Sequence, residues 1–160
     1  GDEFFRLLEV LASFNKPLFG AVNGLAVGFG ATMLLYCDLV LVAETARLRL
    51  PFTELGIVPE AGSSVLLPAR VGWADAMWTM LSSEWFDASE ALRMGLAWRV
   101  VPDYDLRQET SSAAATVAAR DPLAVAATKR LMIDGRVEAA RRGIAREVQE
   151  LRALSEGPRS

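Results

Sequence analysis

The sequence has 160 residues, 52% of them hydrophobic and 23% charged, which fits one folded domain and argues against a disordered or fibrous chain. A net charge of -3 with dispersed basic residues argues against nucleic acid as the main partner, and no apolar run reaches the roughly 18 residues of a membrane span. The absence of histidine and the single cysteine argue against Ser-His-Asp catalysis, the usual zinc sites and an intrachain disulfide, so no metal is expected.

Apolar spacing, glycines and prolines divide the chain into helices and strands. In chain order the predictions are a helix over 2–14, a strand over 18–22, a glycine-rich turn, a helix from 31 to 36, and strands over 39–43 and 47–50. A segment over 52–64 that is mostly loop follows, and then helices from about 63 to 70 and over 74–81 and 87–94, a strand over 98–101, and helices over 106–120, 122–133 and 137–154. Asp87 and Glu90 predict a capping box, and Gly95 predicts the end of that helix. Gly135 is predicted to separate the last two helices.

The turn formed by Gly28, Phe29 and Gly30 separates an apolar strand from an apolar helix. Two glycines that flank one residue let the backbone turn tightly and let a ligand approach the main chain. If the helix begins at Ala31, the N–H groups of Phe29, Gly30 and Ala31 lack intrahelical acceptors and lie at its positive end. Such donors suit a developing oxyanion. The alternative is that the glycines only allow the strand and the helix to pack closely.

Without histidine, a carboxylate is the candidate general base. Glu60 lies in an otherwise apolar loop, 57–62, that contains a proline and ends in a glycine. A carboxylate held near apolar surface has a raised pKa, which makes it a better base at neutral pH. The alternative is a loop carboxylate that caps the helix beginning near Ser63 and otherwise contacts only water.

Several different short motifs follow one another along most of the chain. They are Lys16-Pro17, Ala21-Val22-Asn23-Gly24, Ala26-x-Gly28-x-Gly30, Cys37-Asp38, Leu55-Gly56-Ile57-Val58-Pro59, Val71-Gly72, Ala88-x-Glu90-Ala91, Gly95-Leu96 and Val100-Val101-Pro102. This pattern resembles the crotonase superfamily, the enoyl-CoA hydratase/isomerase family. The resemblance implies an α/β fold of ββα turns wound into a spiral. We expect residues 1–102 to be a partial spiral core that lacks its N-terminal turns, and 103–160 to be a C-terminal helical region that mediates trimerisation.

The resemblance also implies a substrate and partners. Members bind acyl-CoA thioesters and usually form trimers or dimers of trimers, so we expect an acyl-CoA substrate and a homotrimer or hexamer. Coenzyme A is part of that substrate, and no separate cofactor is expected. No nucleic acid or membrane partner is expected. A cytoplasmic location is the default, because no secretory leader opens the sequence.

One donor of the family's oxyanion hole matches the backbone amide of Phe29, which agrees with the interpretation of the glycine turn. In relatives the second donor and most contacts to the adenine and phosphates come from a segment that would precede Gly1, so we expect the chain to be part of a longer protein. The predicted substrate-binding residues are Ala26, Val27, Gly28, Gly30, Leu50, Phe52, Val58 and Leu66.

The carboxylate pattern favours one reaction within the family. Hydratases of this family hold a water with two glutamates, and those positions here are Thr32 and Phe52. Glu60 instead matches the acidic residue of a Pro-(Glu/Asp)-x-Gly loop in the single-base enoyl-CoA isomerases. We therefore expect isomerisation of 3-enoyl-CoA to 2-enoyl-CoA with Glu60 as base. The alternatives are a 2-enoyl-CoA hydratase or a non-catalytic acyl-CoA-binding or assembly subunit.

Overall fold

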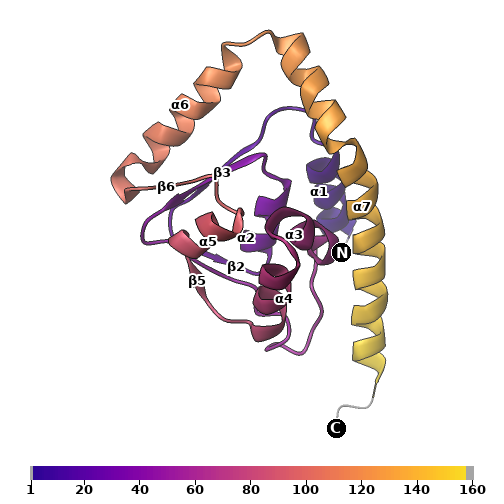
Figure 1. Ribbon diagram of the computed structural model, residues 1–160. Helices are drawn as coiled ribbons and strands as arrows, with labels where there is room; N and C mark the ends of the chain where they lie inside the picture. Colours follow the sequence, from indigo (N-terminus) through magenta and orange to yellow (C-terminus); the bar gives the residue numbers. More distant parts are fainter. Residues whose placement is uncertain (1, 158–160) are drawn as a thin grey trace.

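Short strands and helices make up residues 2–157, which are the residues that the computed structural model describes (Figure 1). Gly1 and residues 158–160 of the predicted C-terminal region lie outside this part. The strands are β1 Phe19–Val22, β2 Leu25–Val27, β3 Leu39–Ala43, β4 Arg47–Arg49, β5 Phe86–Asp87 and β6 Arg99–Val101. The helices are α1 Asp2–Ser13, α2 Phe29–Thr32, the 3-10 helix η1 Met33–Tyr36, α3 Ser63–Val71, α4 Trp73–Ser82, α5 Ala88–Met94, the 3-10 helix η2 Asp103–Asp105, α6 Leu106–Ala118 and α7 Pro122–Glu156.

The strands of residues 2–157 form two sheets, in the orders β1-β3-β6 and β2-β4-β5. β1 is parallel to β3, with Phe19 opposite Leu39, and β2 is parallel to β4, with Leu25 opposite Arg47. The pair β1 and β2 is therefore followed by α2 and η1 and then by a second pair, β3 and β4, that lies beside the first. This is one step of the ββα spiral that the resemblance implies.

The buried core joins the sheets to helices from both ends of the chain. Leu41 of β3 and Leu48 of β4 are fully buried, as are Tyr36 of η1 and Ala140 of α7, and Leu8 of α1 is nearly so. Burying a large apolar side chain contributes about 1.5–3 kcal/mol, so this core is the main source of stability. β3 lies between two parallel neighbours, which explains its continuous apolar sequence.

The long helix α7 runs along one side of the molecule and packs against α1 and α3 (Figure 1). Arg141 of α7 forms an ion pair with Glu9 of α1, and Lys129 pairs with Asp38, which directly precedes β3. α6 packs on β1 and β3 and leads into α7. None of the helices in residues 2–157 is both long enough and apolar enough to cross a membrane.

The predicted break at Gly135 is wrong. α7 is continuous from Pro122 to Glu156, where the sequence predicted separate helices over 122–133 and 137–154. A glycine inside a helix costs only about 1 kcal/mol relative to alanine. Burial of Ile133, Ala140 and Gly143 against the core offsets that cost, so the helix passes through Gly135.

The predicted start and end of α5 are confirmed. The Asp87 side chain accepts a hydrogen bond from the Glu90 N–H at 2.9 Å, and the Glu90 side chain accepts one from the Asp87 N–H at 3.0 Å. Gly95 ends the helix in the left-handed conformation, with φ of 89°. These elements have strictly local causes, which is why sequence alone predicts them.

Candidate functional site

Two adjacent backbone donors of the glycine turn have no acceptor among residues 2–157. Gly28 has φ of 56° and ψ of -120°, and its N–H donates to the Arg49 carbonyl of β4 at 3.0 Å. Its carbonyl accepts from the N–H groups of Ala31 at 3.0 Å and Thr32 at 2.9 Å. Within residues 2–157 the N–H groups of Phe29 and Gly30 have no acceptor. The helix thus begins at Phe29 rather than Ala31, and Ala31 is not one of the free donors.

The Phe29 side chain is anchored on α1. Its ring meets the Phe4 ring edge to face, with the centroids 5.1 Å apart. Aromatic pairs of this geometry are favourable beyond the area they bury. Because the ring is held in this contact, the part of Phe29 that remains for a ligand is its backbone N–H.

The loop that carries Glu60 is tied to the segment that follows the glycine turn. The fully buried Tyr36, at the end of η1, donates from its hydroxyl to the Ala61 carbonyl at 2.6 Å. Burial raises the pKa of Tyr36 to about 12, so the hydroxyl keeps its proton and stays a donor at neutral pH. The Glu60 carbonyl accepts from the Ser63 N–H at 3.0 Å and from its hydroxyl at 2.6 Å. The loop backbone is therefore fixed at Glu60 itself and at Ala61, which follows it.

A second carboxylate, Glu147 of α7, holds the end of the loop at the start of α3. It is only 7% exposed and accepts from the Gly62 N–H at 2.7 Å, the Ser64 N–H at 2.9 Å and the Ser64 hydroxyl at 2.6 Å. A negative charge at the first turn of α3 is favourable because the N–H groups there have no intrahelical partner. The carboxylate that caps this helix is thus Glu147. Glu147, and not the Glu60 side chain, has the helix-capping role that the sequence left open for Glu60.

The side chain of Glu60 is half-buried and makes no hydrogen bond within residues 2–157. Burial raises the pKa of its carboxyl group, and the negative charge of Glu147 raises it further. A carboxylate with a raised pKa is a stronger proton acceptor than an exposed glutamate. Glu60 therefore has the properties of a general base. The sequence analysis did not identify Glu147, whose charge helps to raise the pKa of Glu60.

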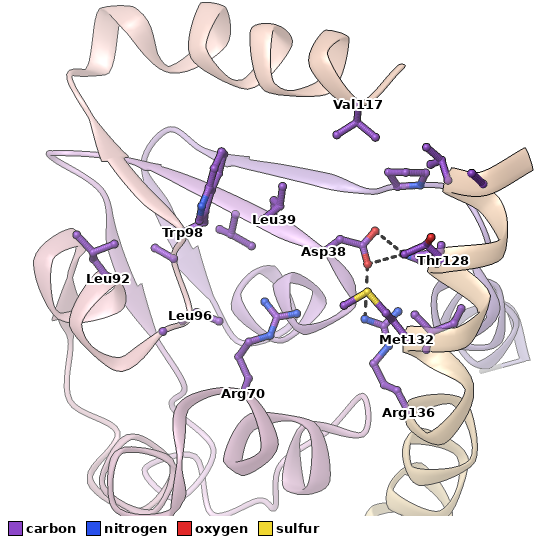
Figure 2. Close-up of a pocket in the computed structure, with 18 residues that line it drawn as sticks. Asp38, Leu39, Arg70, Leu92, Leu96, Trp98, Val117, Thr128, Met132 and Arg136 are labelled. Atoms are coloured by element: carbon purple, nitrogen blue, oxygen red, sulfur yellow. Dashed lines mark hydrogen bonds and ion pairs between the residues drawn. The ribbon is translucent and has the colours of Figure 1, made fainter. Parts of the chain in front are cut away.

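The other predicted site residues divide by burial. Ala26 of β2 and Leu50, Phe52 and Leu66 belong to the buried core, whereas Gly28 and Val58 are partly buried and Val27 and Gly30 are exposed. Thr32, at one of the hydratase glutamate positions, is buried, and its hydroxyl donates to the Phe29 carbonyl at 3.4 Å. Two cavities within residues 2–157, one beside Asp38 (Figure 2) and one beside Asn15, are lined by none of the predicted site residues. The same residues contain no cluster of histidine, cysteine, aspartate or glutamate side chains placed to hold a metal ion.

Comparison with known proteins places this geometry in a family. A family model described as "Enoyl-CoA hydratase/isomerase" matches residues 1–156. The chain is 40% identical over 129 residues to a probable enoyl-CoA hydratase of Rhodobacter capsulatus, covering 81% of this chain and 50% of that protein. It is 38% identical over 144 residues to the 2,3-dehydroadipyl-CoA hydratase of Escherichia coli, covering 90% and 56% of the two proteins.

The fold agrees with these sequence matches. The crystal structure of an enoyl-CoA hydratase/isomerase from Pseudoalteromonas atlantica matches with a TM-score of 0.91 and 40% identity, covering 96% of this chain and 61% of that one. The chain spans about half the length of the curated relatives it matches. Its motifs, its ββα spiral and these matches lead to one conclusion: the chain belongs to the enoyl-CoA hydratase/isomerase family of the crotonase superfamily.

Proposed function

We propose that this chain provides the base and one oxyanion donor of an enzyme that converts 3-enoyl-CoA to 2-enoyl-CoA. The observation that carries the proposal is Glu60, a half-buried carboxylate with a raised pKa on a loop whose backbone is fixed by Tyr36 and Glu147. The free N–H of Phe29 supports the same site, because the family's oxyanion donor matches this residue.

The proposed reaction needs one base that acts twice. The Glu60 carboxylate removes a proton from C2 of the thioester, and the electron pair moves into the carbonyl to form an enolate. The Phe29 N–H, with a second amide that the family resemblance places upstream of Gly1, stabilises the negative oxygen. Glu60 then returns the proton to C4, which restores the carbonyl and leaves the double bond between C2 and C3. One carboxylate suffices because both carbons lie on the same face of the allylic system.

The residues at the hydratase glutamate positions support isomerisation over hydration. Phe52 is 2% exposed and Thr32 is 1% exposed, and neither side chain ionises at neutral pH. Such residues provide no carboxylate to hold and activate a water. A pocket without this water protects an enolate intermediate from side reactions.

The decisive experiment measures Glu60→Gln in the full-length protein with 3-hexenoyl-CoA as substrate. Loss of a general base lowers kcat by roughly 10²- to 10⁴-fold, and we expect a fall in this range. Glu54→Gln is the matched control, because Glu54 lies in the same stretch and pairs with Arg49 at the surface. An unchanged rate of isomerisation in Glu60→Gln would overturn the proposal.

Hydration of 2-enoyl-CoA is the second candidate. It is favoured by the names of the relatives, which include hydratases of Rhodobacter capsulatus and Escherichia coli. Water addition to crotonyl-CoA by the same preparation, faster than turnover of 3-hexenoyl-CoA, would favour this candidate. Lack of turnover of either substrate would favour a non-catalytic acyl-CoA-binding or assembly role.

The remaining parts of the proposal concern partners. An acyl-CoA substrate brings its own coenzyme A, so the proposed reaction uses no further cofactor. We also propose a homotrimer or hexamer assembled through the C-terminal helices, in the cytoplasm. The assembly is tested below.

A further inference from the structure

The turn that follows Glu60 contains an unusual backbone conformation. Ala61 has a φ of 60°, and Ser83 is the only other residue among 2–157, glycines aside, whose φ is positive. In this left-handed region the Cβ atom of an L-residue lies too close to a backbone carbonyl oxygen, so the conformation is strained. Gly62, the next residue, is also left-handed, with φ of 73°. The chain thus passes from Glu60 into α3 through two left-handed residues, and the first of them carries a side chain.

Strain of this kind persists only where neighbouring groups hold it. Ala61 is 2% exposed, and its carbonyl accepts the hydrogen bond from the fully buried Tyr36 hydroxyl at 2.6 Å. Within residues 2–157 this is the only hydrogen bond that Ala61 makes. The other hydrogen bonds of the loop, described above, end on the residues on either side of Ala61. Tyr36 is therefore the residue that holds the strained position itself.

The conformation of Ala61 sets the direction of Glu60. Because φ is the rotation about the N–Cα bond, a change of Ala61 from the left-handed to the right-handed helical region would turn the Glu60–Ala61 peptide by about 120° relative to α3. Such a turn would break the hydrogen bond of 2.6 Å from the Ser63 hydroxyl to the Glu60 carbonyl and would move the half-buried Glu60 side chain. The position of the proposed base thus depends on the strained residue that follows it.

Tyr36 also connects this turn to the proposed oxyanion donor. It is the last residue of η1, which follows directly on α2, and α2 begins at Phe29. The segment from Phe29 to Tyr36 is thus one continuous stretch of helical backbone, with the Phe29 N–H at one end and the Tyr36 ring at the other. One buried hydroxyl therefore relates the position of the base to that of the donor.

We propose that Tyr36 is a positioning residue, whose hydroxyl holds Ala61 in the left-handed conformation and thereby fixes Glu60 relative to Phe29. The inference rests on the proposed isomerase function, because it takes Glu60 as the base. Tyr36 and Ala61 are both buried, so we expect neither to contact the substrate. Their effect should therefore appear in kcat, with little change in KM.

The test is Tyr36→Phe in the full-length protein with 3-hexenoyl-CoA, because phenylalanine keeps the ring and removes the hydroxyl. Misplacing a reacting group by about 1 Å costs roughly 10²-fold, so we expect kcat to fall by about 10- to 100-fold while KM stays nearly unchanged. Thr79→Val is the matched control, since it also removes a buried hydroxyl, one that donates only within α4. Its kcat should match that of the unmutated protein.

Glycine at position 61 provides a second readout. Glycine adopts a positive φ without strain, so adding Ala61→Gly to Tyr36→Phe should raise kcat by about tenfold over Tyr36→Phe alone. A purely structural role of Tyr36 predicts no such recovery. If circular dichroism shows that Tyr36→Phe does not fold, Ala61→Val replaces it, because a β-branched residue resists the left-handed conformation while Tyr36 is still present. Its kcat should fall by a similar factor.

Glu60→Gln, measured alongside, separates the two possible failures. If Glu60→Gln loses activity while Tyr36→Phe, or Ala61→Val in its place, keeps the unmutated kcat, the positioning role is overturned and the proposed function stands. A loss that appears in KM rather than kcat, an equal loss in Thr79→Val, or no recovery in the double variant would also overturn the positioning role. An unchanged rate in Glu60→Gln would overturn the proposed function and this inference with it.

Discussion

The carboxylate of Glu147 influences Glu60 without touching it. Both oxygens of Glu147 are occupied by donors of Gly62 and Ser64, so its effect on Glu60 is that of a nearby negative charge. The folded state therefore binds the Glu60 proton more tightly than the unfolded chain does. The stability this provides is fully present below the ordinary glutamate pKa and is lost as the pH rises through the raised pKa. At neutral pH the raised pKa of Glu60 therefore makes the folded state somewhat less stable and makes Glu60 a stronger base.

Glu147→Gln should shift the pH dependence of the proposed reaction. Removing the negative charge removes the second cause of the raised pKa, so the acidic limb of the kcat/KM profile should move to lower pH. Glutamine keeps one acceptor oxygen for the loop, and a fall in kcat by less than about tenfold is expected from the weakened hydrogen bonds.

The profile is measured with 3-hexenoyl-CoA between pH 4 and 8 in Glu147→Gln and in Glu150→Gln, an exposed glutamate of the same helix. The Glu150 variant should keep the unmutated profile. A limb that stays in place, or moves to higher pH, in Glu147→Gln would show that Glu147 only supports the fold of the loop.

Two glycines let α7 approach the loop closely enough for Glu147 to reach it. A Cβ atom added to Gly143 would lie 3.0 Å from the Val65 side chain and 3.4 Å from Gly62 Cα. A Cβ added to Gly62, whose φ is +73°, would lie 3.2 Å from the Tyr36 hydroxyl and 3.3 Å from the Ala140 carbonyl. Small residues at both positions are therefore a condition for the packing of α7 on α3.

Alanine substitutions within α7 should have opposite effects at two glycines. Gly143→Ala overpacks the contact with Val65 and should lower the free energy of unfolding by about 1–3 kcal/mol. Gly135→Ala meets no atom within 4 Å and should raise the free energy of unfolding by up to about 1 kcal/mol, because alanine is the better helix former. Urea unfolding followed by circular dichroism measures both. Destabilisation by Gly135→Ala would contradict the continuous helix.

Elements with local causes could be predicted from the sequence, and elements that depend on distant partners could not. The capping box of α5 and the apolar run of β3 are examples of the first kind. β2 was missed because three residues, Leu25–Val27, between glycines look like a turn until β4 pairs with them. The sequence predicted two helices in place of α7 because Gly135 is a local stop signal, whereas the continuity of α7 depends on burial against the core.

The candidate site shows the same division. Phe29 and Glu60 could be proposed from glycines and apolar neighbours that lie beside them in the sequence. Tyr36 and Glu147 could not, because the first looks like an ordinary core aromatic and the second lies 85 positions from the Gly62 N–H that it accepts from. Lys129 and Arg136 meet Asp38 across a similar separation, so this cluster of charges had no pattern in the sequence either.

At the scale of the whole molecule, the long helix α7 carries large apolar side chains that are exposed. One side of the helix is attached to the core through Lys129, Arg141 and Glu147. On another side Leu123 is 79% exposed and Leu131 is 82% exposed. They lie eight positions apart, about 12 Å along the helix axis and about 80° around it, so they share one broad side of the helix. Exposed large apolar residues that share a side of a helix are typical of interaction surfaces, which makes this side of α7 a candidate for the proposed interface between copies of the chain.

Leu131→Asp should therefore dissociate the proposed homotrimer or hexamer. A carboxylate placed in an apolar interface loses its hydration without gaining a partner. In a symmetric assembly this cost recurs at every contact between subunits. Light scattering coupled to gel filtration should give the mass of several subunits for the unmutated protein and of one subunit for Leu131→Asp. Leu55→Asp is the control, since Leu55 is also an exposed leucine but lies outside the C-terminal helices, and its mass should stay that of the assembly. A single-subunit mass for the unmutated protein, or an intact assembly in Leu131→Asp, would remove this face of α7 from the proposed interface.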